Sequence, residues 1–206
     1  MIQNIIDLDH AAHLYACKED DPALVLFDFT AAFPSIHRDF TQEALEAFGA
    51  PTMVNNAMTN FYRNNTLTIK HNNQLYEGFC ATRGIRQGCT LSPLIYAISA
   101  DSLLRILSDS LPGITTRAFA DDTAVVLQSW KTQSKKLNTI MGTYSNITTM
   151  SINSKKTIVI HLGDVDKRPD VNLQSPKYTW DTKGKYLGYM IGPGAGDASW
   201  SAPTEK

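Results

Sequence analysis

The chain has 206 residues, of which 43% are hydrophobic and 19% charged, and its formal net charge is −1. This is the profile of one globular domain with a core of its own. No apolar run reaches the roughly 18 to 20 residues of a membrane span, and the N-terminus lacks the basic start and apolar core of a signal peptide. The three cysteines form no CxxC pair, which is typical of reduced thiols and excludes a disulfide framework or zinc site. We therefore expect an intracellular protein of the nucleus or cytoplasm that is neither secreted nor bound to a membrane.

The charges are unevenly distributed along the chain. Residues 1–62 hold two basic and nine acidic side chains, whereas residues 63–206 hold seventeen basic and eleven acidic ones. Such asymmetry can place a basic surface beside an acidic metal site. It is also compatible with a solvated face that has no partner, so the charge distribution alone does not decide between them.

The first predicted elements are a helix and a buried strand. Apolar residues recur at helical spacing over residues 4–17, which predicts an amphipathic helix. Residues 23–27 form a continuous apolar run, as expected for a strand buried on both faces, and this strand leads straight into Asp28. An acid at this position is either a turn former or a functional ligand.

Two helices and a hairpin are predicted next. A helix over residues 39–48 opens with Asp39 and Gln42, which resemble a capping box, and Pro51 opens a second helix that ends near residue 63. Residues 66–70 and 74–79 then alternate in polarity around a turn at residues 71–73, which predicts a hairpin.

A glycine-containing loop and a long helix follow the hairpin. The glycines of the segment 83–93 permit close approach of the backbone to a ligand. Ser92 and Pro93 are typical of an N-cap and a first helical residue, and they open an apolar helix that extends to about Leu107.

The chain is organised around the segment 118–127, in which two adjacent acids lie between apolar, β-prone runs. This pattern predicts a strand, a tight turn carrying Asp121 and Asp122, and a returning strand. An isolated Asp-Asp pair is most often a solvated turn. Two carboxylates held on a rigid hairpin nevertheless form half of a Mg²⁺ site, because a hard cation requires fixed oxygen ligands. Such a site needs a further carboxylate from elsewhere in the fold.

The remaining segments are predicted as a basic helix at residues 131–148, a strand at 157–160, a polar loop at 163–176, a final strand at 185–191 and a frayed tail at 193–206. From Asp28 onward the order of elements matches a split β-α-β-β-α-β arrangement. We therefore expect an α+β fold, an antiparallel sheet with helices packed on one face. In this fold the strand ending at Asp28 lies next to the hairpin that carries Asp121, so that three distant carboxylates converge.

Five blocks of the sequence, in this order, carry a family resemblance: LVLFDFTAAF, RGIRQGCTLSPL, AFADDTAVVL, INSKKT and KYLGYMI. They resemble the palm motifs A to E of reverse transcriptases from non-LTR (LINE-like) retrotransposons. The resemblance covers residues 1–192. It implies the palm of a right-hand polymerase that copies an RNA template into DNA from a DNA primer and dNTPs. It also implies two Mg²⁺ ions, for which Mn²⁺ is a possible substitute.

The resemblance also assigns the metal site. By matching position, Asp28 and Asp121 correspond to the two metal-bridging carboxylates of the family and Asp122 to the neighbouring acid of the same site. The backbone carbonyl of Phe29 corresponds to a further metal ligand. These three acids are the catalytic residues that the resemblance implies.

Further positions match the family's substrate contacts. Phe33 matches the steric gate, a ring that would clash with a ribose 2′-hydroxyl, although a core aromatic is the plainer interpretation. The other positions that match nucleotide contacts are Arg86, Gln87, Gly88 and Lys156, and those that match primer or template contacts are Arg83, Leu187 and Gly188. Arg86 is also compatible with a solvated loop cation, and Lys156 with an ordinary exposed lysine before a strand.

The chain departs from the family pattern at Pro34, at Thr90 and at residues 148–150, none of which removes a catalytic carboxylate. The finger strands and the thumb of the family are expected to be missing from residues 1–192. This leaves two interpretations, a polymerase palm and a non-catalytic remnant that at most binds nucleic acid weakly. A third is another palm polymerase, such as an RNA-dependent RNA polymerase or an intron-type reverse transcriptase. Phe33 disfavours ribonucleotide use and Cys89 disfavours the intron type. The oligomeric state stays open.

Overall fold

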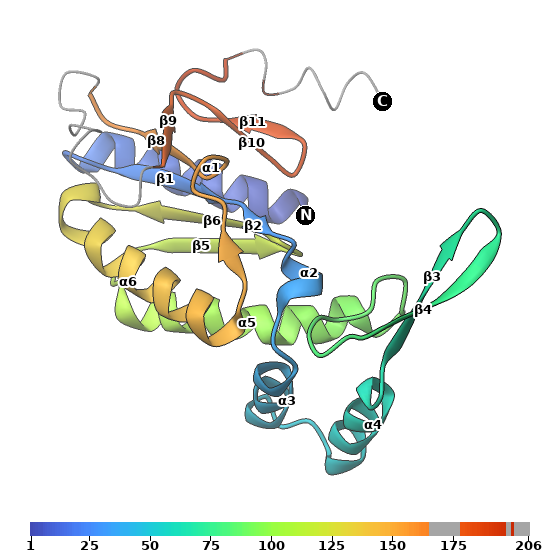
Figure 1. Ribbon diagram of the computed structural model, residues 1–206. Helices are drawn as coiled ribbons and strands as arrows, with labels where there is room; N and C mark the ends of the chain where they lie inside the picture. The colour runs from blue at the N-terminus through green and yellow to red at the C-terminus, as the bar shows by residue number, and fades with distance from the viewer. Residues whose placement is uncertain (165–177, 197–198, 200–206) are drawn as a thin grey trace.

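The structure is a computed structural model that describes residues 1–164, 178–196 and 199 (Figure 1). Its helices are α1 (Ile2–Lys18), α2 (Ala32–Ser35), α3 (Arg38–Ala47), α4 (Thr52–Tyr62), α5 (Ser92–Ser110) and α6 (Trp130–Thr148). Its strands are β1 (Ala23–Phe27), β2 (Phe29–Thr30), β3 (Thr66–His71), β4 (Gln74–Cys80), β5 (Thr115–Phe119), β6 (Asp122–Leu127), β7 (Ser151–Ile152), β8 (Ile158–His161), β9 (Thr179–Asp181), β10 (Gly184–Tyr186) and β11 (Tyr189–Ile191). Within the described ranges, no helix is both long and apolar enough to cross a membrane.

The central sheet has the strand order β5-β6-β1-β8-β9. Strand β1 lies between the antiparallel strands β6 and β8, with Val25 opposite both Val125 and Val159. Strand β9 differs from the expected antiparallel arrangement, because it pairs parallel to β8. The connection from β8 to β9 spans residues 162–178, which is long enough for the crossover that a parallel pair requires.

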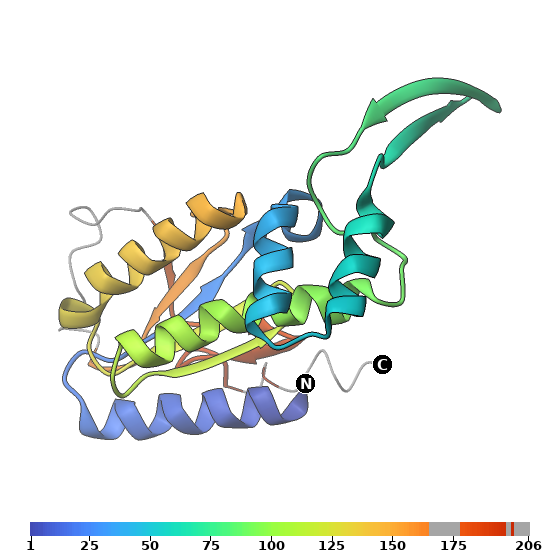
Figure 2. The same cartoon turned by 90° about the horizontal axis from the view of Figure 1, so that it is seen from below.

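Both faces of the sheet are covered, which explains why all five residues of β1 are buried (Figures 1 and 2). On one face, Val25 belongs to a core shared with α5 and α6 through Leu107 and Leu137. On the other face, Leu24 belongs to a second core built with Leu8 of α1 and with the β10–β11 hairpin. The expected palm arrangement is confirmed, with the addition that α1 packs on the face opposite α5 and α6.

Helices α3 and α4 and the β3–β4 hairpin extend away from the sheet (Figure 1). Helix α3 begins differently from the expectation, because His37 is its N-cap and the ring nitrogen Nδ1 accepts a hydrogen bond from the amide of Asp39 at 3.3 Å. The hairpin turn is also one residue shorter than predicted. Asn72 and Asn73 both have positive φ, 46° and 62°, as a two-residue type I′ turn requires.

The predicted final strand, residues 185–191, is in fact the two strands β10 and β11 around a turn at Leu187 and Gly188. Within the segment expected as a frayed tail, Gly194 donates its amide to the carbonyl of Thr182 at 2.9 Å. Residues 197–198 and 200–206 of that tail lie outside the described residues, as do residues 165–177, which include most of the predicted polar loop.

Candidate active site

The acidic residues lie at one end of the central sheet, where β1 and β6 run antiparallel. Phe27, the last residue of β1, is paired with Thr123 of β6. Continuing this register by one residue places Asp28 opposite Asp122. The predicted adjacency of the strand that ends at Asp28 and the hairpin that carries the two acids is therefore confirmed.

The backbone of Asp28 is held by the segment that precedes β8. Its amide donates to the hydroxyl of Thr157 at 3.3 Å, and its carbonyl accepts from the amide of Asn153 at 2.8 Å. Strand β2 continues from Asp28 and pairs with β7, which immediately precedes Asn153. Asp28 thus has a fixed backbone although it lies between two strands.

The two adjacent acids occupy different positions in their hairpin. The turn residues are Ala120 and Asp121, whereas Asp122 is already the first residue of β6 and pairs with Phe119 of β5. The turn places Ala120 at a positive φ of 52°, a left-handed conformation that is uncommon for a residue with a β-carbon. The predicted turn therefore carries Asp121, and Asp122 belongs to the returning strand.

Asp28 and Asp121 act electrostatically on Asp122. The pKa of Asp122 is raised above its usual value, first by loss of solvation and then by the negative charges of Asp121 and Asp28. A bound cation would offset the repulsion between this carboxylate and the other two. Like-charge repulsion is thus already present at this edge of the sheet.

Asp121 and Asp122 have different neighbours. Burial raises the pKa of Tyr96 on α5, and the charge of Asp121 contributes to the same shift. Burial raises the pKa of Tyr186 on β10 to about 12, and here the contributing acid is Asp122. Tyr96 and Tyr186 belong to the cores on opposite faces of the sheet. Successive residues near a strand point to opposite faces, which explains the difference.

This geometry limits how the acids can act as ligands. Among the residues that the structure describes, no group of three or more His, Cys, Asp or Glu side chains is placed to hold a metal ion together. The carboxylates of Asp28, Asp121 and Asp122 share one sheet edge and one electrostatic environment, but they do not form a ready three-carboxylate ligand group. Phe29 could contribute only its backbone carbonyl, because its hydrocarbon ring, which is buried in the core between the sheet and α6, has no ligand atom.

Three of the predicted nucleotide contacts line one pocket. This pocket of about 350 Å³ is lined by Phe33, Gln87 and Gly88 together with four further residues of the segment 89–93. Two backbone hydrogen bonds fasten the loop to the Phe33 segment: Ile85 donates to the carbonyl of Phe33 at 2.8 Å and Gly84 to the carbonyl of Ile36 at 2.9 Å. The first and second sequence blocks thus meet at this pocket.

Arg86 lies apart from that pocket. Its guanidinium carbon lies 4.4 Å from the centroid of the Phe61 ring, and its Nη2 donates to Asn65 Oδ1 at 2.7 Å. These contacts occupy the base of the β3–β4 hairpin. The guanidinium of Arg86 therefore packs at the base of the hairpin, and Arg86 is not among the residues that line the pocket of Gln87 and Gly88.

Of the other predicted contacts, two are exposed and two lie in a half-buried turn. Arg83 and Lys156 are exposed, and the amide of Lys156 donates to the carbonyl of Asn153 at 3.1 Å in the turn before β8. Leu187 and Gly188 form the turn of the β10–β11 hairpin, with φ of 51° and 92°. This turn directly follows Tyr186, whose pKa is influenced by Asp122.

Two residues with structural importance near the site were missed by the sequence reasoning. Arg38 donates to the carbonyls of Tyr62, Arg83 and Gly84 at 3.3, 3.2 and 3.4 Å, so one guanidinium joins both ends of the hairpin to α3. No side-chain pattern could have indicated this, because all three acceptors are backbone atoms. Tyr96 packs directly against Phe33. The sequence indicated only that Tyr96 is an aromatic residue on a predicted helix.

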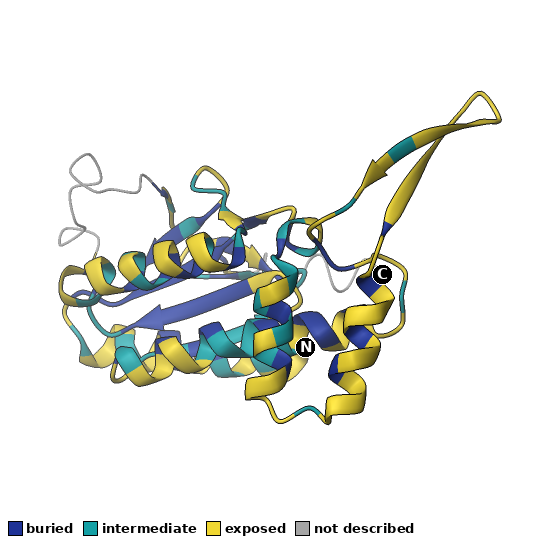
Figure 3. Ribbon diagram, turned by 60° about the horizontal axis from the view of Figure 1, so that its bottom comes forward, coloured by how far each residue is buried: buried dark blue, intermediate teal, exposed yellow. Residues whose placement is uncertain are grey.

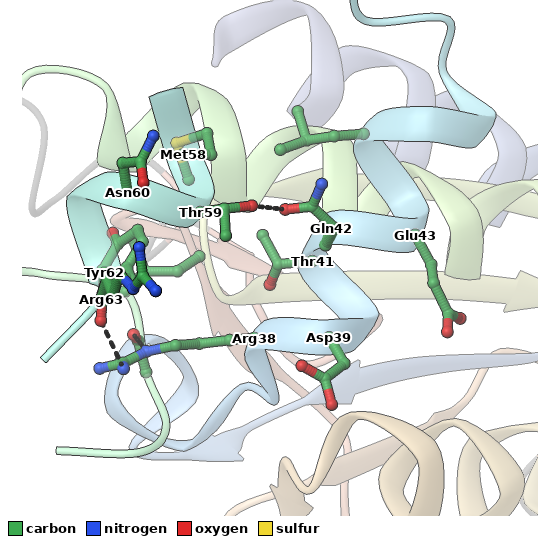
Figure 4. A pocket seen from close by; sticks show the side chains of 13 residues that line it. Arg38, Asp39, Thr41, Gln42, Glu43, Met58, Thr59, Asn60, Tyr62 and Arg63 are labelled. Atoms are coloured by element: carbon green, nitrogen blue, oxygen red, sulfur yellow. Dashed lines mark hydrogen bonds between the residues drawn. The ribbon is translucent and has the colours of Figure 1, made fainter. Parts of the chain in front are cut away.

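A larger cavity, of about 730 Å³, lies between α3 and α4 (Figure 4). Arg38 lies along one side of it, and Gln42 accepts a hydrogen bond from the hydroxyl of Thr59 at 2.9 Å across it. None of the three acids of the sheet edge lines this cavity. It is therefore a feature of the α3–α4 pair and not of the candidate active site.

The chain resembles known proteins both in sequence and in fold. The sequence pattern of the reverse transcriptase (RNA-dependent DNA polymerase) family matches residues 3–191. The Pol polyprotein of the type-1 retrotransposable element R2 of Popillia japonica is 27% identical over 198 residues, and that of the type-2 element R2DM of Drosophila melanogaster is 30% identical over 101 residues. These matches cover 90% and 46% of the chain but only 31% and 10% of the relatives' own length.

Solved structures of telomerase share the fold. Apo telomerase from Candida tropicalis superposes with a TM-score of 0.69 at 12% identity, covering 92% of this chain and 34% of that chain. Telomerase from Candida albicans in complex with a telomeric RNA fragment gives a TM-score of 0.60 at 12% identity, covering 91% and 33%. The fold, the five sequence blocks and the match over residues 3–191 agree. The chain therefore belongs to the reverse transcriptase (RNA-dependent DNA polymerase) family, and its relatives are of the non-LTR retrotransposon type.

Proposed function

We propose that this chain carries the nucleotidyl-transfer site of an RNA-templated DNA polymerase. The observation that carries the proposal is the position of Asp28, Asp121 and Asp122 at one sheet edge, where loss of solvation and then the charges of the first two raise the pKa of the third. The pocket lined by Phe33, Gln87 and Gly88 supplies a neighbouring place for a nucleotide.

The residues present fit hard divalent cations in their chemistry. Carboxylate and carbonyl oxygens are the ligands that Mg²⁺ prefers. In this proposal Asp28, Asp121 and the carbonyl of Phe29 hold the metal, and Asp122 adds negative charge from the neighbouring position. Two bound Mg²⁺ ions, or Mn²⁺ in their place, would lower the pKa of the primer hydroxyl and neutralise charge on the triphosphate. The protein's own contribution is to keep these oxygen ligands in place on two adjacent strands.

The remaining residues would orient the substrates. The ring of Phe33 lines the pocket and would exclude a ribose 2′-hydroxyl, while Gln87 and Gly88 would contact the incoming dNTP. The turn at Leu187 and Gly188 would support the DNA primer, and the exposed Arg83 would contact primer or RNA template. Lys156 is proposed as a proton donor to the pyrophosphate, and Arg86 would act indirectly by fixing the loop.

A second candidate is a non-catalytic descendant of such a polymerase that binds nucleic acid weakly. The observation that favours it is that the described residues contain no group of three acids placed to hold a metal ion. The two candidates differ in one measurable property, which is binding of divalent cations at the acids of the sheet edge.

The first test measures Mn²⁺ binding by electron paramagnetic resonance of the free ion. The protein is compared with Asp121→Asn and with Asp101→Asn, whose carboxylate lies on the outer side of α5 beside Arg105. We expect Asp121→Asn to lose the bound Mn²⁺ and Asp101→Asn to retain it. Equal binding by all three proteins would contradict the metal assignment, whatever their polymerase activity.

The second test is primer extension on an RNA template with Mg²⁺ and dNTPs. Removing a charge-stabilising group from an active site costs about 10²- to 10³-fold in rate, so Asp121→Asn should extend at least that much more slowly. Circular dichroism of the variant should be unchanged, because Asp121 is an exposed turn residue. Absence of both Mn²⁺ binding and extension in the unaltered protein would support the non-catalytic candidate.

A further inference from the structure

The N-terminal helix α1 contacts the strand that leads into the β5–β6 turn. Asn4 Nδ2 donates to the carbonyl of Ala118 on β5 at 2.9 Å, although 114 positions separate the two residues in sequence. One residue earlier on β5, the Nε and Nη2 atoms of Arg117 lie 2.9 and 2.8 Å from Asp7 Oδ2. Figure 1 shows the start of α1 at the same end of the sheet as the β5–β6 turn. Two polar contacts from α1 therefore hold β5 just before this turn.

The contact from Asn4 satisfies a carbonyl on the free edge of the sheet. Strand β5 is an edge strand, whose inner side pairs with β6. Every second carbonyl of an edge strand points away from the sheet and needs a donor from elsewhere. The carbonyl of Thr116 accepts from Arg117 Nη1 at 2.7 Å, and the carbonyl of Ala118 accepts from Asn4. Asn4 thus takes the place of a neighbouring strand at the last outward carbonyl before the turn.

Tyr186, the last residue of β10, brings a buried hydroxyl close to Asn4. Its side chain belongs to the core between the sheet and α1 and is only 2% exposed. Burial raises the pKa of Tyr186 to about 12, and Asn4 lowers it as a hydrogen-bond partner would. Within the described residues, however, the hydroxyl makes no hydrogen bond of regular geometry. A buried hydroxyl without a partner is unfavourable, so a small movement of either side chain that closes this bond would be stabilising.

The pleat of the sheet places Asp122 on the same face as Tyr186. Ala124 and Val126 of β6 belong to the same core as Tyr186. Since every second residue of a strand points to one face, Asp122 shares the face of Ala124. Strand β6 is buried except at this first residue (Figure 3). Asn4 and Tyr186 therefore support the β5–β6 turn from the α1 side of the sheet.

We propose that Asn4 is a positioning residue that couples the β5–β6 turn to the β10–β11 turn. Its Nδ2 holds the carbonyl of Ala118, and its Oδ1 accepts a hydrogen bond from the hydroxyl of Tyr186, which directly precedes the turn at Leu187 and Gly188. Assigning the two turns to metal and primer rests on the proposed function, but the coupling between them does not. Movement of one turn is therefore transmitted to the other through α1.

The first measurement is amide hydrogen exchange by NMR in the unaltered protein and in Asn4→Leu. Leucine is similar in size to asparagine but has no polar side-chain atom. Exchange at residues 118–123 and 185–190 should become about three- to tenfold faster, the effect of losing one hydrogen bond. The matched control is Tyr15→Phe, because the Tyr15 hydroxyl joins α1 to the carbonyl of Gly113 at 2.7 Å, before the other end of β5. The control should leave exchange at both turns unchanged.

A double-mutant cycle tests the hydrogen bond between Asn4 and Tyr186. Tyr186→Phe removes only the hydroxyl and keeps the ring in the core. It should speed exchange at both turns by less than Asn4→Leu does, because the contact of Asn4 with Ala118 remains. The double variant should exchange no faster than Asn4→Leu alone, since both substitutions remove the same bond. Additive effects of the two substitutions would overturn the coupling.

Mn²⁺ binding, measured by electron paramagnetic resonance, tests whether the coupling acts on the acids. Asn4→Leu should weaken binding by about three- to tenfold, whereas Tyr15→Phe should stay within about twofold of the unaltered protein. Equal Mn²⁺ affinity in Asn4→Leu and the unaltered protein would contradict a positioning role toward the acids. If the unaltered protein binds no Mn²⁺, the proposed function fails, and the exchange measurements still decide whether the two turns are coupled.

Two results of the exchange measurements would contradict the proposal directly. One is unchanged exchange at residues 118–123 in Asn4→Leu. The other is an equal acceleration in strands β1 and β8, which would show that Asn4 stabilises the whole fold and does not position a particular turn. Faster exchange confined to the two turns, with the control unchanged, is the result that supports it.

Discussion

The ring of Phe33 lies stacked on the ring of Tyr96, with centroids 4.3 Å apart and planes inclined by 14°. Tyr96 comes from α5 and is only 2% exposed, whereas Phe33 is half-buried and lines the pocket with Gln87. The stack reconciles the two interpretations of Phe33, because one face of the ring packs on the core while the residue still borders the pocket. Tyr96 thereby fixes the position of Phe33.

Phe33→Ala is expected to relax discrimination against ribonucleotides. One missing methylene in a hydrophobic pocket changes selectivity by about 10- to 200-fold. Phe33→Ala removes a whole ring, so the ratio of kcat/KM for dNTP over rNTP should fall by at least about tenfold. The ratio is measured by single-nucleotide extension of a DNA primer on an RNA template. An unchanged ratio in the variant would remove Phe33 from this role.

Tyr96 is predicted to affect the dNTP-over-rNTP ratio indirectly, by positioning the ring of Phe33. Tyr96→Leu removes the stacking partner and should lower the ratio less than Phe33→Ala does. Tyr96→Phe keeps the ring and loses only the hydroxyl, which lies 3.9 Å from the sulfur of Met150, so it should leave the ratio unchanged. A merely structural role would instead lower the rates with both nucleotides equally in Tyr96→Leu.

The sequence predicted the parts of the site that depend on strand order. The apolar run before Asp28 and the hairpin at Asp121 identified the two neighbouring strands. This was possible because strand burial and turn formation depend on the residue types of a short segment. The different neighbours of Asp121 and Asp122 were not predicted, because they depend on which residue begins β6. The role of Arg38 could not be predicted for another reason, because its hydrogen-bond partners are backbone carbonyls that only the fold brings together.

The Asp122 carboxylate makes stability depend on pH. Its pKa is raised in the folded protein, so the folded state binds more protons than the unfolded state at pH values between 3.8 and the raised pKa. The free energy of unfolding then falls as the pH rises through this interval, and the ionised carboxylate is destabilising at neutral pH. Asp122→Asn should raise the melting temperature at pH 7, and this gain should disappear below about pH 3.8.

The measurement is differential scanning fluorimetry of both proteins across this pH range, with Asp101→Asn as the control. Asp101 pairs with Arg105 rather than with other acids, so its replacement should bring no such gain. Added Mn²⁺ should stabilise the unaltered protein more than Asp122→Asn, because a bound cation relieves the repulsion. A gain that is the same at every pH would show that the charge of Asp122 is not its cause.

Two glycines of the second sequence block should differ in their tolerance of a side chain. Gly84 and Gly88 both have a φ of +83°, so alanine brings a backbone strain of about 1 to 2 kcal/mol at either position. At Gly84 the added Cβ would also lie 2.5 Å from the carbonyl oxygen of Pro34, whereas at Gly88 nothing lies within 4 Å. Gly84→Ala should therefore destabilise the fold clearly more than Gly88→Ala, as measured by urea unfolding. Equal losses would mean that the loop is free to move away from Pro34.

A buried pair at the opposite end of β1 should be important for stability. Asp21 Oδ1 and His161 Nε2 lie 3.2 Å apart, and the two side chains are only 5% and 3% exposed. The second carboxylate oxygen accepts from the amide of Lys131 at 2.8 Å, and the carbonyl of Asp21 accepts from the amide of Trp130 at 2.7 Å. One residue thus joins β1, the start of α6 and β8.

Asp21→Ala would leave the Lys131 amide and the His161 ring without their partner in a buried place. Unsatisfied buried groups of this kind are expected to lower the free energy of unfolding by about 2 to 4 kcal/mol. The matched control is Asp9→Ala, which removes the carboxylate 3.6 Å from His13 on the surface of α1, where both side chains are exposed. A surface pair contributes about 0 to 1 kcal/mol. Urea unfolding at pH 7 measures both variants, and equal losses would show that burial of the Asp21–His161 pair does not set its contribution.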